Sequence, residues 1–306
     1  MLKVQVLMST YNGSKYIDAQ LISILNQTYS NITILIRDDG STDNTKEYLE
    51  RYMSQYPSII KCIFGDNLGV IRSFFNLLDE ADKDCEYFAF CDQDDFWLPD
   101  KIERAVNKLE LMSNTPAMIC TATQITDAKL QTLRLWPTNP RRSPSFYNAL
   151  VQNIAVGATI TLNRRALDVL SQERVDPNHI QMHDWWAYLC VSAFGKVIFD
   201  PVPSILYRQH ANNAVGGEAS LLASLQKKWS SFQKHKGKRL LHKQAMEFHR
   251  IHGEHVEQAI RTQLELFIQE RGTLVDRVAY LKDSRLYRNS LLEQLLFRVL
   301  ILAGYI

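Results

Sequence analysis

Three aspartates lie close together in the segment YFAFCDQDDFWL, which covers residues 87–98. Asp92, Asp94 and Asp95 follow an apolar run, and carboxylates at this spacing repel one another unless a cation or hydrogen-bond donors offset their charge. Mg²⁺ and Mn²⁺ prefer oxygen ligands and often bind only one or two protein carboxylates together with phosphate and water. A polar turn that caps a helix opening at Pro99 explains at most one aspartate. The segment therefore predicts a divalent metal site.

Short runs of β-branched residues alternate with helical periodicity before this cluster. Strands are predicted at residues 4–8, 32–40, 59–64 and 87–91, with amphipathic helices within 14–28, 41–56 and 70–81 between them. This βαβαβαβ order predicts a mainly parallel sheet with helices on both faces, joined by right-handed crossovers.

Polar loops follow all four predicted strands. They cover residues 9–13, 37–43, 65–69 and 92–95, and they are rich in Asp, Asn, Ser and Thr. The carboxyl ends of parallel strands meet at one edge of a sheet, where ligands bind in folds of this class. Ordinary turn chemistry explains single positions such as Asn12 or Gly40, but it does not explain this concentration of polar groups. We expect a ligand site at this edge.

The rest of the chain continues the alternation before it becomes helical. The pattern predicts a helix over 99–112, a strand at 117–123, a surface loop at 136–145, a strand leading into a helix within 157–170, a helix over 182–195, two short strands at 196–200 and 204–210, and amphipathic helices towards the C-terminus. We therefore predict one α/β domain over 1–216 and a helical extension over 217–306.

Composition indicates an ordinary soluble globular protein, with 46% hydrophobic and 22% charged residues in 306. The net charge of +2 divides into −4 for residues 1–216 and +6 for residues 217–306, so the extension suits phosphate-rich surfaces such as membrane or nucleic acid. No leader resembling a signal peptide is seen, and no apolar run reaches the ~18–20 residues that span a bilayer. Five scattered cysteines indicate reduced thiols in a cytosolic protein.

Five segments in a fixed order resemble the family-2 glycosyltransferases of GT-A fold, which transfer a sugar from a nucleoside diphosphate. They are VQVLMSTYNG, RDDGSTDNT, DQDD followed by FWLPDK, HDWW and YRQH. The resemblance covers about residues 1–215, and it is greatest to the bacterial rhamnosyltransferases that build surface polysaccharides from dTDP-L-rhamnose. It implies a GT-A-type, Rossmann-like sheet between helices.

The resemblance also implies roles for the acidic cluster. Asp94 is expected to bind Mn²⁺ or Mg²⁺ directly, while Asp92 bonds the ribose or shares the metal. Asp95 either supports this site or caps the following helix. His210, in YRQH, is either a further metal ligand or a structural residue. A cation here would neutralise the nucleoside diphosphate that leaves the sugar.

Residues of the first two loops are expected to bind the nucleotide. Asp39 lies where family members accept a hydrogen bond from the pyrimidine N3–H, which thymine and uracil both offer, whereas Asp38 is expected to be structural. Thr10 and Tyr11 match nucleotide-contacting positions, although Tyr11 could instead pack in the core. Arg72 is a candidate phosphate ligand that departs from the family pattern, whose arginine–asparagine pair falls further along the chain.

The HDWW segment corresponds to the catalytic base of the family. Asp184 is expected to take the proton of the acceptor hydroxyl, as direct inversion requires, although a carboxylate opening a helix is also an ordinary N-cap. His183 is expected to orient Asp184. Trp185 and Trp186 offer flat faces for the acceptor sugar, or they belong to the core.

The resulting hypothesis is an inverting, non-processive hexosyltransferase that moves L-rhamnose to a hydroxyl of a lipid-linked saccharide acceptor. One alternative is the same reaction with UDP-galactose or UDP-glucose, and another is a non-catalytic nucleotide-sugar-binding or scaffold protein. A nucleotidyltransferase would need a glycine-rich phosphate loop near the N-terminus, which STYNGSKY matches poorly. A P-loop is absent. A processive synthase would need QxxRW after the base, whereas QTLRLW (131–136) precedes it.

The extension suggests attachment to a membrane surface. Residues 227–250 hold eight Lys or Arg side chains, interleaved with Trp229, Phe232, Leu240, Leu241 and Phe248. Such a helix can bind anionic lipid of the inner leaflet, so we expect a cytoplasmic protein held peripherally at the inner face of the cell membrane. The alternative is a helix packed on the catalytic domain.

Two further features of the extension have simpler readings. The terminal segment 291–306 is a second anchor or a contact for a homo-oligomer. The histidines at 242, 249, 252 and 255 lack a zinc-ligand pattern. No nucleic acid partner is expected, because no companion motif accompanies the basic residues.

Overall fold

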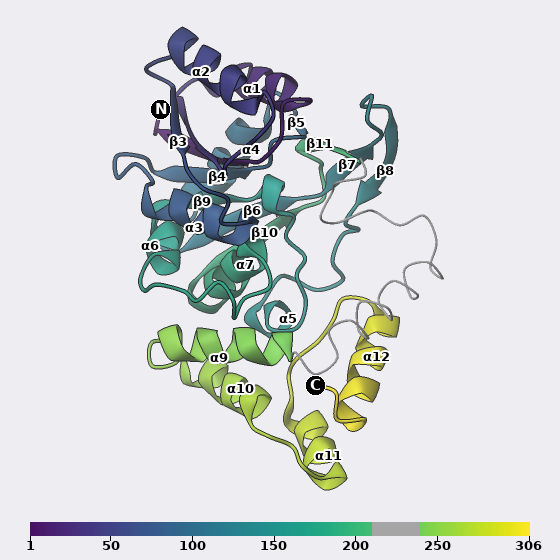
Figure 1. The fold of residues 1–306 in the computed structure, drawn as a ribbon. Helices are drawn as coiled ribbons and strands as arrows, with labels where there is room; N and C mark the ends of the chain where they lie inside the picture. Colours follow the sequence, from purple (N-terminus) through teal and green to yellow (C-terminus); the bar gives the residue numbers. More distant parts are fainter. Residues whose placement is uncertain (210–238) are drawn as a thin grey trace.

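The protein is described by a computed structural model that covers residues 1–209 and 239–306. A seven-stranded sheet forms its centre (Figure 1). In spatial order its strands are β10 (Lys196–Asp200), β6 (Ala117–Thr121), β9 (Thr161–Asn163), β4 (Tyr87–Cys91), β1 (Val4–Thr10), β2 (Ile32–Asp38) and β3 (Ile60–Phe64). All are parallel except β9, which is antiparallel to both β4 and β6. The predicted α/β fold with a mainly parallel sheet is confirmed.

Helices cover both faces of this sheet, and the alternation along β1 shows why. Val4, Val6 and Met8 point into one hydrophobic cluster, which they share with α1 (Ile17–Leu25), α2 (Thr45–Gln55) and α4 (Lys101–Glu110). Leu7 points into the other cluster, with α3 (Val70–Asp79), α6 (Arg164–Leu170) and α7 (His183–Phe194). A central strand that is apolar on both sides in this way must be buried between two layers.

A second, four-stranded sheet lies beside the first. Its order is β5 (Phe96–Trp97), β11 (Ile205–Arg208), β7 (Thr123–Thr126) and β8 (Thr132–Trp136). The sequence prediction missed the β7–β8 hairpin, because the side chains of β8 are largely exposed and give no buried periodicity. This small sheet matters for the site, since β5 directly follows the acidic cluster and pairs with β11.

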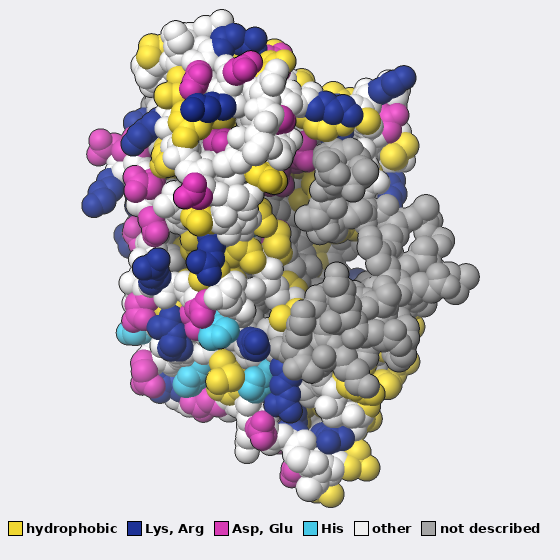
Figure 2. All heavy atoms as spheres, viewed as in Figure 1, with side chains coloured by type: hydrophobic (Ala, Val, Ile, Leu, Met, Phe, Trp, Pro, Cys, Tyr) yellow, Lys and Arg dark blue, Asp and Glu magenta, His cyan; other side chains and the backbone are white. Residues whose placement is uncertain are grey.

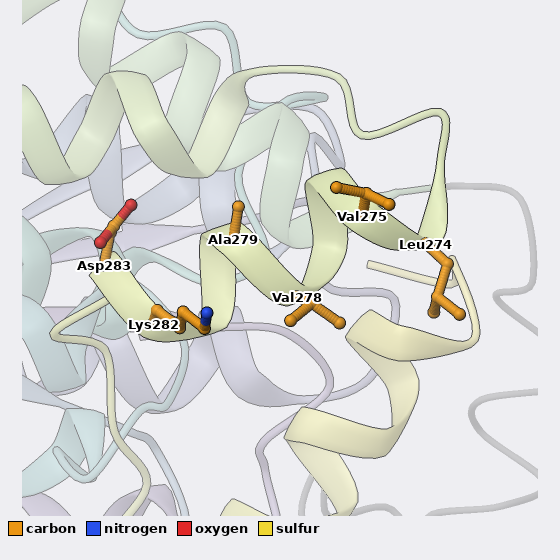
Figure 3. Close-up of a pocket in the computed structure, with 6 residues that line it drawn as sticks. All are labelled: Leu274, Val275, Val278, Ala279, Lys282 and Asp283. Carbon is orange, nitrogen blue, oxygen red and sulfur yellow. The ribbon is translucent and has the colours of Figure 1, made fainter.

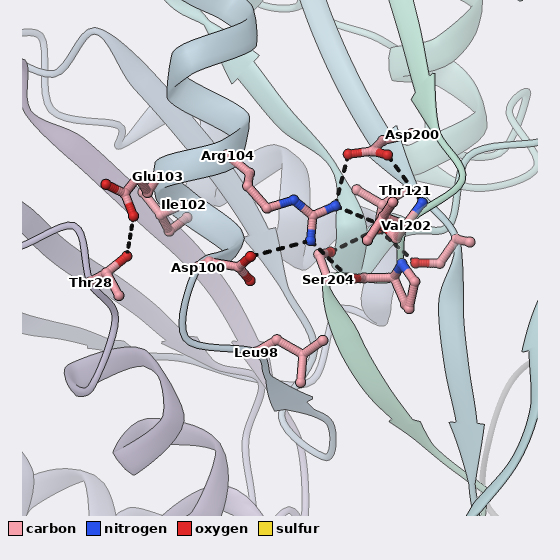
Figure 4. Close-up of polar contacts among 12 residues, drawn as sticks. Thr28, Leu98, Asp100, Ile102, Glu103, Arg104, Thr121, Asp200, Val202 and Ser204 are labelled. Carbon is pink, nitrogen blue, oxygen red and sulfur yellow. Dashed lines mark hydrogen bonds and ion pairs between the residues drawn. The ribbon is translucent and has the colours of Figure 1, made fainter.

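Polar contacts fix the small sheet to the large one (Figure 4). Arg104 of α4 donates to the carboxylate of Asp200, at the end of β10, over 2.8 Å and to the carbonyl of Pro203 over 3.1 Å. The hydroxyls of Thr121 and Ser204 lie 2.7 Å apart. The turn between β10 and β11 is therefore held against the helix that follows the acidic cluster.

Four helices close the chain: α9 (Leu240–His252), α10 (Gln258–Ile268), α11 (Leu274–Asp283) and α12 (Leu291–Leu302). They do not form a separate core. Phe248 of α9 is fully buried, and its ring lies 5.5 Å from that of Phe146 in α5 (Phe146–Ala149) and 6.1 Å from that of Trp186 in α7. Phe267 and Phe297 belong to the same hydrophobic cluster as the central sheet. The predicted boundary at residue 216 lies outside the described residues.

The packing of α9 corrects one sequence prediction. Phe248 was expected among the side chains that enter a lipid surface, but it is buried against the α/β domain instead. Hydrogen bonds fix the polar side of the contact: the amide of Gln181 donates to Gln244 over 3.0 Å, and the amide of Asp176 donates to Glu247 over 2.8 Å. In this part of the extension, the alternative of a helix packed on the domain is the correct one.

Candidate active site

The acidic cluster lies at the carboxyl end of β4, beside the ends of β1 and β2. Burial and the neighbouring charges of Asp94 and Asp184 raise the pKa of Asp92 to about 7. The charge of Asp184 acts on Asp92 although the two are far apart in the sequence. The predicted base and the predicted metal ligand Asp94 therefore both act electrostatically on Asp92.

The backbone of the acidic cluster is held from β11 by Arg208. Its guanidinium Nε donates to the carbonyl of Asp94 over 2.9 Å, and its backbone amide donates to the carboxylate of Asp95 over 3.2 Å. Asp95 is fully buried and does not cap α4, whose N-cap is Asp100, so that alternative for Asp95 was wrong. Arg208 stands in the YRQH segment, but no local pattern predicted that it reaches the acidic cluster.

The donor set at this edge fits a hard divalent cation. Carboxylates that raise one another's pKa are stabilised by a positive charge between them, and Mg²⁺ and Mn²⁺ take oxygen ligands. Among residues 1–209 and 239–306, no three His, Cys, Asp or Glu side chains are grouped so that they could hold a metal ion. An ion bound here would need further ligands such as phosphate or water. His210 lies outside the described residues.

Asp184 lies in the first turn of α7, where its carboxylate accepts three hydrogen bonds. The amide of Trp185 donates to Oδ1 over 2.6 Å, the amide of Gly157 to Oδ2 over 3.2 Å, and the side-chain Nδ2 of Asn153 to Oδ1 over 3.1 Å. Burial raises the pKa of Asp184 to about 6, and these hydrogen bonds act in the opposite direction. At neutral pH the group is therefore mostly ionised and able to accept a proton. Sequence reasoning missed Asn153, which no local pattern links to Asp184.

Two neighbours of Asp184 do not have their predicted roles. His183 stacks on Phe74 with 3.7 Å between ring centroids, and neither ring nitrogen has a hydrogen-bond partner among the described residues. Burial lowers its pKa to about 3, so it is a neutral core residue that neither orients Asp184 nor contacts the acceptor. Trp186 is only 1% exposed and packs on Phe248, so no sugar can stack on it.

Trp185, the other predicted acceptor residue, is partly exposed. Its indole N–H donates to the carbonyl of Ala149 over 2.6 Å, which fixes the orientation of the ring.

The loop after β2 is built around two buried carboxylates. Asp38 accepts hydrogen bonds from the hydroxyl of Thr10 over 2.9 Å and from that of Ser41 over 2.6 Å, a structural role as predicted. Asp39 pairs with Arg37 and accepts from the amides of Leu68 and Gly69 over 2.9 and 2.8 Å. Asp39 thus ties the loop at 65–69 to β2. A pyrimidine N3–H would have to donate to a carboxylate oxygen of Asp39 that already accepts a hydrogen bond from a backbone amide.

A clamp that the sequence did not predict joins the first loop to the acidic cluster. The side-chain amide of Gln93 accepts from the amide of Tyr11 over 2.8 Å and donates to its carbonyl over 2.9 Å. A Cβ atom on Gly13 would lie 2.1 Å from Oε1 of Gln93, so this close approach requires glycine. The ring of Tyr11 is 46% exposed at this edge, and Arg72 is exposed on α3.

Two comparisons with known sequences agree on one family. The model of glycosyl transferase family 2 matches residues 5–170. The dTDP-rhamnosyl transferase RfbG of Shigella flexneri is 31% identical over 228 residues, which cover 71% of this chain and 76% of that protein.

Solved structures show the same fold at low identity. S. aureus TarS 1–349 in complex with UDP-GlcNAc has a TM-score of 0.60 at 14% identity, covering 87% of this chain and 71% of that one. The mannosyltransferase PcManGT of Pyrobaculum calidifontis, in complex with GDP-Man and Mn²⁺, has a TM-score of 0.51 at 15% identity, covering 92% and 85%.

Proposed function

This chain belongs to glycosyl transferase family 2, and we propose that it moves a single sugar from a nucleoside diphosphate to an acceptor hydroxyl with inversion at the anomeric carbon. The observation that carries the proposal is that Asp92 lies near enough to both Asp94 and the candidate base Asp184 for their charges to raise its pKa. A single displacement needs one base for the acceptor and one positive site for the leaving group.

The proposed donor is dTDP-L-rhamnose. The support is the relative named a dTDP-rhamnosyl transferase, which is similar over most of both chains. Tyr11, which is exposed at this edge, would lie against the pyrimidine and exposed Arg72 against phosphate, whereas Thr10 and Asp39 are 1% and 2% exposed and would hold the two loops beneath the nucleotide. A UDP-linked sugar such as UDP-galactose or UDP-glucose is the alternative, since a protein of the same fold binds UDP-GlcNAc.

A divalent cation, Mn²⁺ or Mg²⁺, is proposed as cofactor, held by Asp94 and Asp92, with His210 as a further candidate. When bound, it would supply the positive charge that the departing diphosphate requires. The mannosyltransferase of the same fold holds Mn²⁺ in its complex, which supports the proposal. Arg208 and Gln93 would keep the acidic cluster in place from two sides.

In the proposed reaction, Asp184 removes the proton from the acceptor hydroxyl. The acceptor oxygen forms its bond to the anomeric carbon as the bond from that carbon to the diphosphate oxygen breaks. The proton ends on the carboxylate of Asp184, whose pKa of about 6 suits a base that works near neutral pH. Trp185 would lie against the acceptor sugar.

The function is tested with a panel of donors and Mn²⁺ or Mg²⁺. We expect dTDP-L-rhamnose to raise the midpoint of thermal unfolding more than UDP-galactose or UDP-glucose, because selective binding stabilises by about 2.7 kcal/mol at a hundred times Kd. With a lipid-linked saccharide acceptor, we expect release of nucleoside diphosphate and a product whose anomeric configuration, measured by NMR, is inverted.

Other outcomes of this panel have distinct meanings. If a UDP-sugar stabilises the protein more than dTDP-L-rhamnose does, that UDP-sugar is the donor. Binding without release of nucleoside diphosphate would support the non-catalytic alternative, and retention of configuration would contradict the mechanism.

The proposed acceptor is a lipid-linked saccharide of surface polysaccharide synthesis, reached from the cytoplasmic face of the cell membrane. In the part of the chain that the structure describes, no helix is long and apolar enough to cross a bilayer. Exposed apolar side chains instead gather on α11 and α12 (Figures 2 and 3). They are Leu274, Val275, Val278, Leu291, Leu292, Leu295 and Val299, with exposed Lys282, Arg285 and Arg298 nearby in sequence. We propose that this face, and not α9, contacts anionic lipid.

Sedimentation with vesicles tests this contact. We expect the full chain to sediment with phosphatidylglycerol vesicles, less so at high salt, and Leu295→Glu to weaken sedimentation because it places a negative charge in the apolar face. Leu111→Glu, at another exposed leucine just after α4, is the control. Equal sedimentation of both variants would refute the proposed face. A shift of Leu295→Glu from dimer to monomer would assign the face to a homo-oligomer instead.

A further inference from the structure

The loop between α5 and the short 3-10 helix Gly157–Thr159 is anchored to the C-terminal helices. The side chain of Gln152 donates to the carboxylate of Glu293 in α12 over 2.8 Å, and its Oε1 accepts from the amide of Asn289 over 2.8 Å. Asn148 donates to the carbonyl of Tyr287 over 3.0 Å and also to Gln152 over 3.0 Å. The residues just before Asn153 are thus fixed by the segment that leads into α12.

Asn153 itself makes two different hydrogen bonds. Its Oδ1 accepts from the amide of Ala155 over 3.0 Å, which shapes its own loop. Its Nδ2 donates to Oδ1 of Asp184 over 3.1 Å, and the amide of Gly157, at the end of the same loop, donates to Oδ2. Both oxygens of the candidate base are therefore held by one loop.

We propose that Asn153 is a positioning residue for Asp184. The segment 287–293 braces the loop that carries Asn153, so the C-terminal helices help to orient the base. This inference rests on the proposed function, because it takes Asp184 as the base. A carboxylate that must meet an acceptor hydroxyl works only within a narrow range of orientations. Two donors from a braced loop restrict that range, whereas the bond from Trp185 comes from the helix of Asp184 itself.

The substitution Asn153→Asp separates positioning from loop structure. An aspartate keeps the oxygen that accepts from Ala155, but it loses the N–H donor and places a second negative charge beside Asp184. We expect kcat to fall about ten- to a hundred-fold, the range of one hydrogen bond to a charged group, with little change in the donor KM. Asn153→Ala, which loses both bonds, should lower kcat and the thermal unfolding midpoint together.

The brace is tested separately through Gln152. Gln152→Leu keeps the size of the side chain and removes its bonds to Glu293 and Asn289, so we expect a several-fold loss of kcat at unchanged donor KM. Glu270→Ala, which breaks only an exposed ion pair with Arg239 elsewhere in the C-terminal helices, is the matched control and should leave kcat unchanged.

Three results would overturn the inference. The first is a wild-type kcat for Asn153→Asp. The second is an equal loss in Gln152→Leu and Glu270→Ala. The third concerns both Asn153→Asp and Gln152→Leu. If the donor affinity falls as much as kcat and the unfolding midpoint falls as well, the loop has a purely structural role. If Asp184→Asn keeps normal turnover, the proposed function itself fails, and that outcome is distinct from a failure at Asn153 alone.

Discussion

Asp94→Ala is expected to abolish sugar transfer while the fold stays intact. Asp94 is the proposed direct ligand of the cation, and without that charge the departing diphosphate is not neutralised. The apo protein should be as stable as the wild type or more so, because Asp94 is one of the two charges that raise the pKa of Asp92. Transfer at saturating Mn²⁺ and the midpoint of thermal unfolding measure the two effects.

The control for Asp94→Ala is Asp168→Ala, an exposed aspartate on α6 away from the site, which should change neither quantity. Wild-type turnover of Asp94→Ala at metal concentrations controlled with a chelator would end the metal hypothesis. An unfolding midpoint that falls by many degrees would instead make Asp94 a structural residue.

Asp184→Asn is expected to lower kcat by ~10²–10⁴-fold, the usual contribution of a general base, with donor binding preserved. The amide keeps the shape of the carboxylate and loses its basicity. It can still accept from Trp185 and Asn153, while the contact with Gly157 loses its acceptor, so only a modest loss of stability should accompany the change. Turnover close to that of the wild type would leave Asp184 with a helix-terminal role only.

The same residue should set the pH dependence. A base acts in its ionised form, so the wild-type kcat/KM should rise with pH through the pKa of Asp184 in the free protein, about 6, and be lost as the pH falls below it. The residual activity of Asp184→Asn should lack this acidic limb, which rate measurements between pH 5 and 8 would reveal.

The alternation of the main strands and helices and the polar edge of the sheet were predictable, because β1, β2 and β4 are largely buried and give apolar runs. The small sheet was not, since β8 is exposed and β5 has only two residues. Within the site, short motifs located Asp92, Asp94 and Asp184. Their partners Gln93, Arg208 and Asn153 depend on contacts between distant segments, which no local spacing encodes.

The wrong predictions have a common cause. Trp186, His183 and Phe248 are apolar or aromatic residues on helices, and periodicity shows that one face is apolar without showing what covers it. For Phe248 the cover is Trp186 and Phe146, not lipid. For His183 it is Phe74, on which the imidazole ring is stacked.

The shared core of the sheet and the C-terminal helices restricts how such enzymes can exchange parts during evolution. Phe248, Phe267 and Phe297 pack in the same cluster as the strands. A recombination point after β11 would therefore separate two halves of one hydrophobic core. A hybrid protein would fold only if the side chains of its sheet and of its C-terminal helices were complementary. The C-terminal helices should thus be inherited together with the sheet that they cover.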